Sequence, residues 1–125
     1  MDYATFTRTT AQRAGVPEET AERMEHATLR TLADRISGGE AHDLAAQLPA
    51  ALQEDLRPPR EEAEAFGVDE FVRRVAERGD VGPHEARTGA AAVLTTVREA
   101  VTPGEFDDVL SQLPQEYREL VGPMA

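Results

Sequence analysis

The chain contains no cysteine among its 125 residues. Disulfide bonds, thiolate metal sites and thiol nucleophiles are therefore excluded. No eighteen apolar residues stand together, and residues 1–10 lack a basic patch followed by an apolar run, so we expect neither a membrane span nor an export signal. We expect a soluble, cytoplasmic protein, because a chain without cysteine suits a reducing compartment.

Positive charge is also scarce. The chain has thirteen basic side chains, all arginine, and 24 acidic ones, which gives a net charge of -11. Such a surface repels phosphate backbones, so we expect no binding to nucleic acid. The exclusive use of arginine and the absence of asparagine are typical of high-GC coding, which indicates a bacterial source.

The short catalytic motifs are missing as well. We find no glycine-rich phosphate loop, no H-E-x-x-H and no G-x-S-x-G, and Ser37 and Ser111 are the only serines. We therefore predict that the protein is not an enzyme and uses no cofactor.

What the chain does have is an internal repeat. Residues 6–56 align with residues 71–121 at a constant offset of 65, without a gap, and 16 of the 51 paired positions are identical. Further pairs, such as Leu32 with Val97 and Leu44 with Val109, are apolar in both copies. The shared positions are those expected of a core.

The pattern of each copy predicts four helices. Val68, Phe71, Val72 and Val75 show the i, i+3, i+4, i+7 spacing of an amphipathic helix, and no segment alternates with period two. We predict an all-α protein of two tandem four-helix repeats, related by pseudo-twofold symmetry and packed as one compact bundle. Repeat one spans 1–56, a proline-containing and charged linker that favours solvent spans 57–66, and repeat two spans 67–125.

An acidic motif recurs in the middle of each copy. Glu, Asp and Gln at i, i+3 and i+7 share one helix face, and they are Glu40, Asp43 and Gln47 in one copy and Glu105, Asp108 and Gln112 in the other. If the pseudo-twofold axis brought these faces together, Glu40, Asp43, Glu105 and Asp108 would form a site for a hard cation or a basic ligand.

A structural interpretation competes with this one. Ser37-x-x-Glu40 and Thr102-x-x-Glu105 have the spacing of a capping box, in which the glutamate reaches back to the cap residue. Asp43 and Asp108 would then pair with the repeated arginines, which are Arg8, Arg13, Arg73 and Arg78.

Arginine, glutamine and histidine residues are further candidates for a binding site. Arg8 and Arg73, and Gln47 and Gln112, recur in both copies and are possible recognition residues. The three histidines recur at no equivalent position, since His26 aligns with Ala91, His42 with Asp107 and His84 with Glu19. We interpret the histidines as solvated surface residues rather than metal ligands.

The repeated G-E-x-x-D-x-x-x-Q-L-P and the segment Q-L-P-Q-E-Y-R-E-L near the end resemble the bacterial domain-of-unknown-function family 2267. The resemblance runs from Tyr3 to Val121. It implies a small helical bacterial protein and carries over no site residues.

Two functional hypotheses follow. The first is a non-enzymatic module that interacts with another protein or with itself, since two similar halves create a groove between them. The alternative is a small-ligand or cation-binding protein that uses the repeated acidic face.

Overall fold

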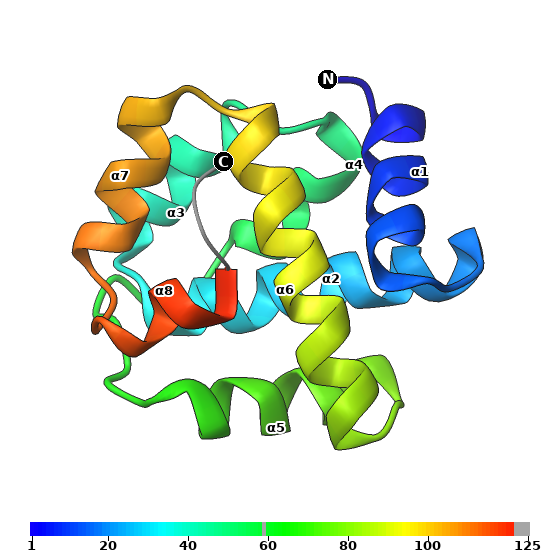
Figure 1. Cartoon of the computed structure of the whole chain (residues 1–125). Coiled ribbons are helices and arrows are strands. Elements are labelled where there is room, and N and C mark those ends of the chain that lie inside the picture. Colours follow the sequence, from blue (N-terminus) through cyan, green and yellow to red (C-terminus); the bar gives the residue numbers. More distant parts are fainter. Residues whose placement is uncertain (59, 122–125) are drawn as a thin grey trace.

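The computed structural model describes residues 1–58 and 60–121, and every regular element in these residues is a helix (Figure 1). This confirms the predicted all-α class. The helices are α1 (Tyr3–Ala14), α2 (Glu18–Arg35), α3 (Gly38–Ala45), α4 (Ala50–Gln53), the short 3₁₀ helix η1 (Glu54–Leu56), α5 (Val68–Gly79), α6 (Pro83–Ala100), α7 (Pro103–Ser111) and α8 (Glu116–Val121).

Local signals explain where these helices begin and end. The Asp2 side chain accepts a hydrogen bond from the Thr5 amide at 2.8 Å and so caps α1. Gly15 ends α1 with a φ of 67°, a left-handed conformation that costs glycine nothing. Asp80 takes the same conformation after α5, with a φ of 53°. Pro83 and Pro103 occupy the first turns of α6 and α7, where the missing amide hydrogen is not needed.

The two long helices, α2 and α6, cross at the centre of the molecule (Figure 1). Helix α1 packs against both of them, and α5 also packs against both. Helices α3 and α7 lie against each other at one side. The first helix of each sequence half therefore contacts the long helix of the other half.

Apolar side chains from all of these helices form one core. Phe6, Leu29, Phe71, Val93 and Tyr117 are among its fully or almost fully buried members. Met24 of α2 fills the space left by two glycines, which are Gly89 of α6 and Gly79 at the end of α5. None of the helices in the described part of the chain is both long and apolar enough to cross a bilayer.

Of the linker predicted over 57–66, the described residues 57–58 and 60–66 are mostly exposed, as expected, but several of them also contact the helices. The Glu64 amide donates to the Asp34 carbonyl at 2.8 Å, and the Gly38 amide donates to the Glu61 carbonyl at 2.9 Å. The Arg74 guanidinium lies 4.1 Å from the centre of the Phe66 ring. Backbone hydrogen bonds and the Phe66 ring thus attach these residues to the bundle, while most of their side chains stay exposed.

Candidate acidic site

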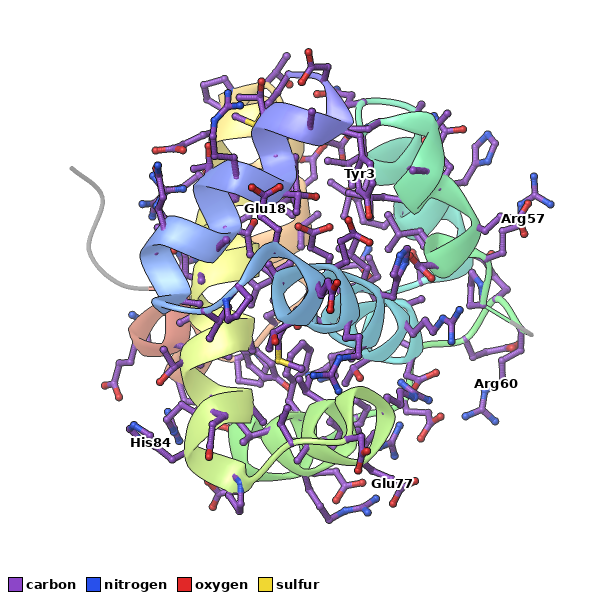
Figure 2. The ribbon with its side chains drawn as sticks, turned by 90° about the vertical axis from the view of Figure 1, so that its right-hand side faces the viewer. Tyr3, Glu18, Arg57, Arg60, Glu77 and His84 are labelled. Carbon is purple, nitrogen blue, oxygen red and sulfur yellow. The ribbon has the colours of Figure 1, made fainter. Side chains whose placement is uncertain are left out.

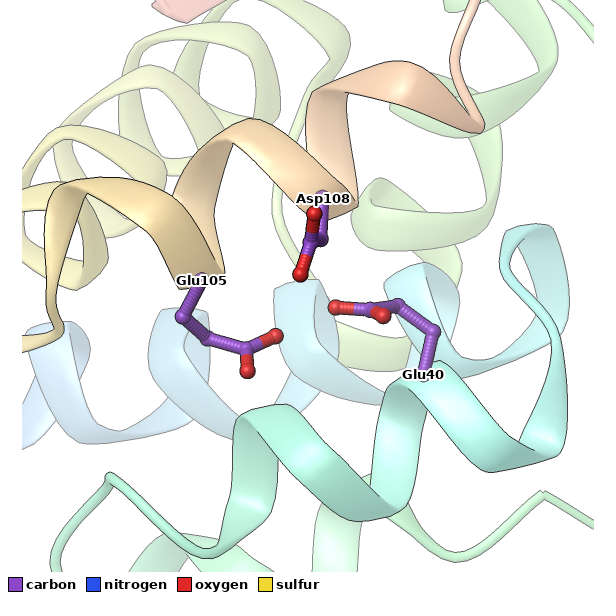
Figure 3. Close-up of side chains that lie close together, drawn as sticks. All are labelled: Glu40, Glu105 and Asp108. Atoms are coloured by element: carbon purple, nitrogen blue, oxygen red, sulfur yellow. The ribbon is translucent and has the colours of Figure 1, made fainter.

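Three carboxylates converge between α3 and α7. Oxygen atoms of Glu40, Glu105 and Asp108 all lie within 4.8 Å of one another. Glu40 projects from α3, whereas Glu105 and Asp108 project from α7, and Figure 3 shows the three side chains pointing toward a common centre. Glu40 and Glu105 are partly buried, and Asp108 lies at the exposed edge.

The helix caps explain why the two glutamates face each other. The Ser37 hydroxyl accepts from the Glu40 amide, and the Thr102 hydroxyl accepts from the Glu105 amide, both at 3.2 Å. This half of the predicted capping box is confirmed. Each glutamate stands in the first turn of its helix, where the helix dipole favours a negative charge.

The second predicted contact of the capping box, in which the glutamate side chain accepts from the amide of the cap residue, is wrong. The Ser37 amide donates to Oε1 of Gln112 at 2.7 Å, and the Thr102 amide donates to Oε1 of Gln47 at 2.8 Å. Each recurrent glutamine thus caps the helix of the opposite sequence half, in the place that a capping-box glutamate would take. Glu40 and Glu105 are left to turn toward each other.

Two oxygen atoms of this cluster have no hydrogen-bond partner. They are Oε1 of Glu40 and Oε2 of Glu105, and both are shielded from solvent. Burial, together with a hydrogen bond to Glu105 and the charges of Glu105, Asp108 and Asp43, raises the pKa of Glu40 to about 8. A proton or a cation between the two glutamates would therefore stabilise this arrangement.

Asp43, the fourth predicted member, does not join the three converging carboxylates. It is exposed, although it lies close enough for its charge to raise the pKa of Glu40. The expected ion pairs from the repeated arginines to Asp43 and Asp108 are wrong, because these arginines bond elsewhere. Arg13 contacts Thr96 and Glu99, and Arg78 contacts Thr31 and Asp34. Arg73 and Arg8 are exposed and contact residues of their own helices, which are Glu70 and Glu77 for Arg73 and Thr5 for Arg8.

One histidine departs from the expected solvated surface. His26 Nδ1 lies 2.5 Å from Oδ2 of Asp55, and Arg30 Nε lies 2.9 Å from Oδ1 of the same carboxylate. Asp55 is only 6% exposed. The repeat did carry a signal of this burial, because the equivalent position in the second half is the apolar Leu120. His42 and His84 are exposed, and Figure 2 shows His84 at the periphery.

Sequence reasoning also missed a buried polar group in the first half. Glu25 is fully buried, with Thr7, Thr10 and Thr28 buried as well. The aligned residues of the second half are Ala90, Val72, Val75 and Val93, all apolar and buried. Comparing the two copies position by position for a change from apolar to polar would have found Glu25.

Comparison with known protein families gives a match. The model of a family described as "Uncharacterized conserved protein (DUF2267)" matches residues 3–120. No curated protein matches the chain.

Proposed function

The chain belongs to the uncharacterized conserved protein family DUF2267, and from the geometry of its own residues we propose that it binds a hard divalent cation through Glu40, Glu105 and Asp108. The observation that carries the proposal is the convergence of the three carboxylates within 4.8 Å. Two oxygens on opposite sides of a Ca²⁺ ion lie about 4.6–5.2 Å apart, so a single ion can contact all three residues.

The unpartnered oxygens of Glu40 and Glu105 support the same proposal. A buried carboxylate oxygen without a hydrogen bond is costly, and either a cation or a proton shared by the two glutamates removes that cost. A cation does so with all three carboxylates ionised. Asp43, which is exposed, would supply a further oxygen or an outer contact through water.

We also infer that the two halves are related by a pseudo-twofold axis through this site. Reciprocal contacts support it. Ser37 binds Gln112 as Thr102 binds Gln47, and Arg13 binds Thr96 as Arg78 binds Thr31, with each residue 65 positions from its counterpart. Met24 and Gly89, which touch each other, are likewise 65 positions apart. An ion held between α3 and α7 would then tie the two halves together.

Isothermal titration calorimetry of the EDTA-treated and dialysed protein with Ca²⁺, Mg²⁺ and Mn²⁺ tests the proposal. We expect saturable binding of one ion per chain. The substitutions Glu40→Gln and Glu105→Gln should each weaken the affinity at least about tenfold, because each removes a charged ligand.

The matched control is Asp107→Asn, which removes the same charge from an exposed neighbour on α7. Binding that drops as much in this variant as in Glu105→Gln would mean diffuse attraction to an acidic surface and would refute the site. If the protein binds none of the three ions and Glu105→Gln makes it more stable at pH 8, Glu40 and Glu105 share a proton instead of binding a cation.

The interaction module and the absence of enzymatic activity stay predictions. Light scattering coupled to size-exclusion chromatography, with and without the bound ion, tests self-association separately from cation binding. A monomer under both conditions would contradict self-association.

A further inference from the structure

A second site of interest lies between α1 and α2, away from the acidic site. Glu25 of α2 is 0% exposed, and its Oε1 accepts a hydrogen bond from the Thr7 hydroxyl at 3.2 Å. Oε2 of Glu25 has no partner, and neither have the buried hydroxyl oxygens of Thr10 and Thr28. We call Glu25 and these three threonines the Glu25 cluster. It combines a buried carboxyl group with too few hydrogen-bond donors to stabilise its ionised form.

The second half of the chain shows that the fold does not require this polarity. At the four equivalent positions it has Val72, Val75, Ala90 and Val93, and these pack in the buried interface of α5 and α6. A carboxyl group in the first half therefore costs stability that valine and alanine would not cost. This cost indicates that the Glu25 cluster does something other than hold the core together.

Helix α1 is also held by few apolar contacts. Its buried apolar residues are Phe6 and Ala11, whereas α5 buries Val68, Phe71, Val72 and Val75. Less apolar area leaves water when α1 packs than when α5 packs, so α1 detaches more easily. In Figure 2, Tyr3 lies on the side of α1 that faces the rest of the molecule.

We propose that the Glu25 cluster is a pH-sensitive switch, in which loss of the Glu25 proton releases α1 from α2. The docked helix keeps Glu25 away from water and therefore favours the neutral carboxyl group. The released helix exposes Glu25 to water, where the carboxylate is well solvated. Rising pH thus shifts the population toward the released form.

The charged neighbours of Glu25 act in both directions, since Glu22 favours the neutral carboxyl group and His26 favours the carboxylate. Tyr3 approaches from α1, Glu22 and His26 belong to α2, and His26 is bound to Asp55 of η1. The charged contact between α1 and α6 is Arg13 with Glu99. Burial raises the pKa of Glu25 to about 7, although the nearby Thr7 and Tyr3 hydroxyls act in the opposite direction.

The sign and size of the effect follow from these states. The docked form binds the proton more tightly than the released form, whose carboxyl group has an ordinary pKa near 4.5. Docking is therefore strongest below about pH 4.5 and weakens as the pH rises toward 7 and slightly above. Between pH 5.5 and pH 8 the docking equilibrium should fall by about tenfold or more.

Hydrogen exchange followed by mass spectrometry tests the switch in the whole chain. We expect the protection factors of amides in α1, corrected for the intrinsic pH dependence of exchange, to fall at least about tenfold from pH 5.5 to pH 8. Those of α5 serve as the internal control and should stay constant. Glu25→Gln, which mimics the protonated side chain, should abolish the fall in α1.

A second variant keeps the test decisive if Glu25→Gln folds poorly. Thr7→Val, Thr10→Val, Glu25→Ala and Thr28→Val together give the first half the residues of the second, and α1 should then be as protected at pH 8 as at pH 5.5. Protection of α1 that does not change with pH in the native chain would overturn the proposal. An equal fall in the native chain and in either variant, or an equal fall in α1 and α5, would also overturn it.

Discussion

At the scale of single residues, the acidic site depends on which side chain caps which helix. Gln112 and Gln47 satisfy the amides of Ser37 and Thr102 from the opposite helix. The glutamates are therefore not needed at the caps. The same motif that suggests two local capping boxes thus forms a contact between α3 and α7.

Gln112→Ala should destabilise the protein and disturb the acidic site. It leaves the Ser37 amide without its acceptor, which costs about 1–2 kcal/mol of unfolding free energy. Glu40 can then turn back toward Ser37, so the cation affinity should fall as well. Urea denaturation and calorimetry measure both effects. Gln115→Ala, at an exposed position, should change stability by no more than about 0.5 kcal/mol. An unchanged cation affinity in Gln112→Ala would contradict this role of the glutamine.

The pKa of Glu40 predicts how cation binding depends on pH. This pKa is raised to about 8, chiefly by burial, so a proton occupies the site through the neutral range. A cation must displace that proton, and the affinity should therefore rise from pH 6 to pH 8 and level off above pH 8. Calorimetry in buffers of different ionisation enthalpy should detect proton release on binding at pH 7. Binding without proton release would contradict the raised pKa.

At the scale of elements, the packing of α2 against α6 and α5 depends on one large and two small residues. A Cβ atom on Gly89 would lie 2.6 Å from the sulfur of Met24 and 2.9 Å from its Cγ. Gly79 is close to the end of the same methionine side chain. The close approach of the two long helices thus requires glycine beside Met24.

Gly89→Ala should therefore destabilise the protein by about 1–3 kcal/mol, despite the better helix propensity of alanine. Thermal unfolding followed by circular dichroism measures the loss. The control is Gly104→Ala in α7, where an added Cβ meets nothing within 4 Å and the change should be neutral or slightly stabilising. If Met24→Ala is added to Gly89→Ala, the two effects should not be additive, because the smaller side chain makes room for the methyl group. Additive effects would contradict a direct contact.

At the scale of the whole molecule, the two sequence halves pack into each other. Helix α1 contacts α6 and α5 contacts α2, so neither half can complete its core alone. We therefore expect the chain to unfold as one cooperative unit, as small single domains do.

The positions of the tyrosines allow this to be measured. Tyr3 lies in the first half and Tyr117 in the second, and the chain has no tryptophan. The variants Tyr3→Phe and Tyr117→Phe each keep one tyrosine. In each variant, the midpoint of urea unfolding measured by the fluorescence of that tyrosine should coincide with the midpoint measured by circular dichroism. Different midpoints within one variant would mean that the halves unfold separately.

Sequence alone determined the helices, because the spacing of apolar residues, the caps and the prolines act within a few turns of the chain. It also determined that the two halves contain equivalent residues, since Glu40 and Glu105 align without a gap. Only the tertiary structure decided that three of the four recurrent carboxylates meet and that the glutamines cap the opposite helices. These features depend on contacts between residues far apart in the chain, whose geometry periodicity does not specify.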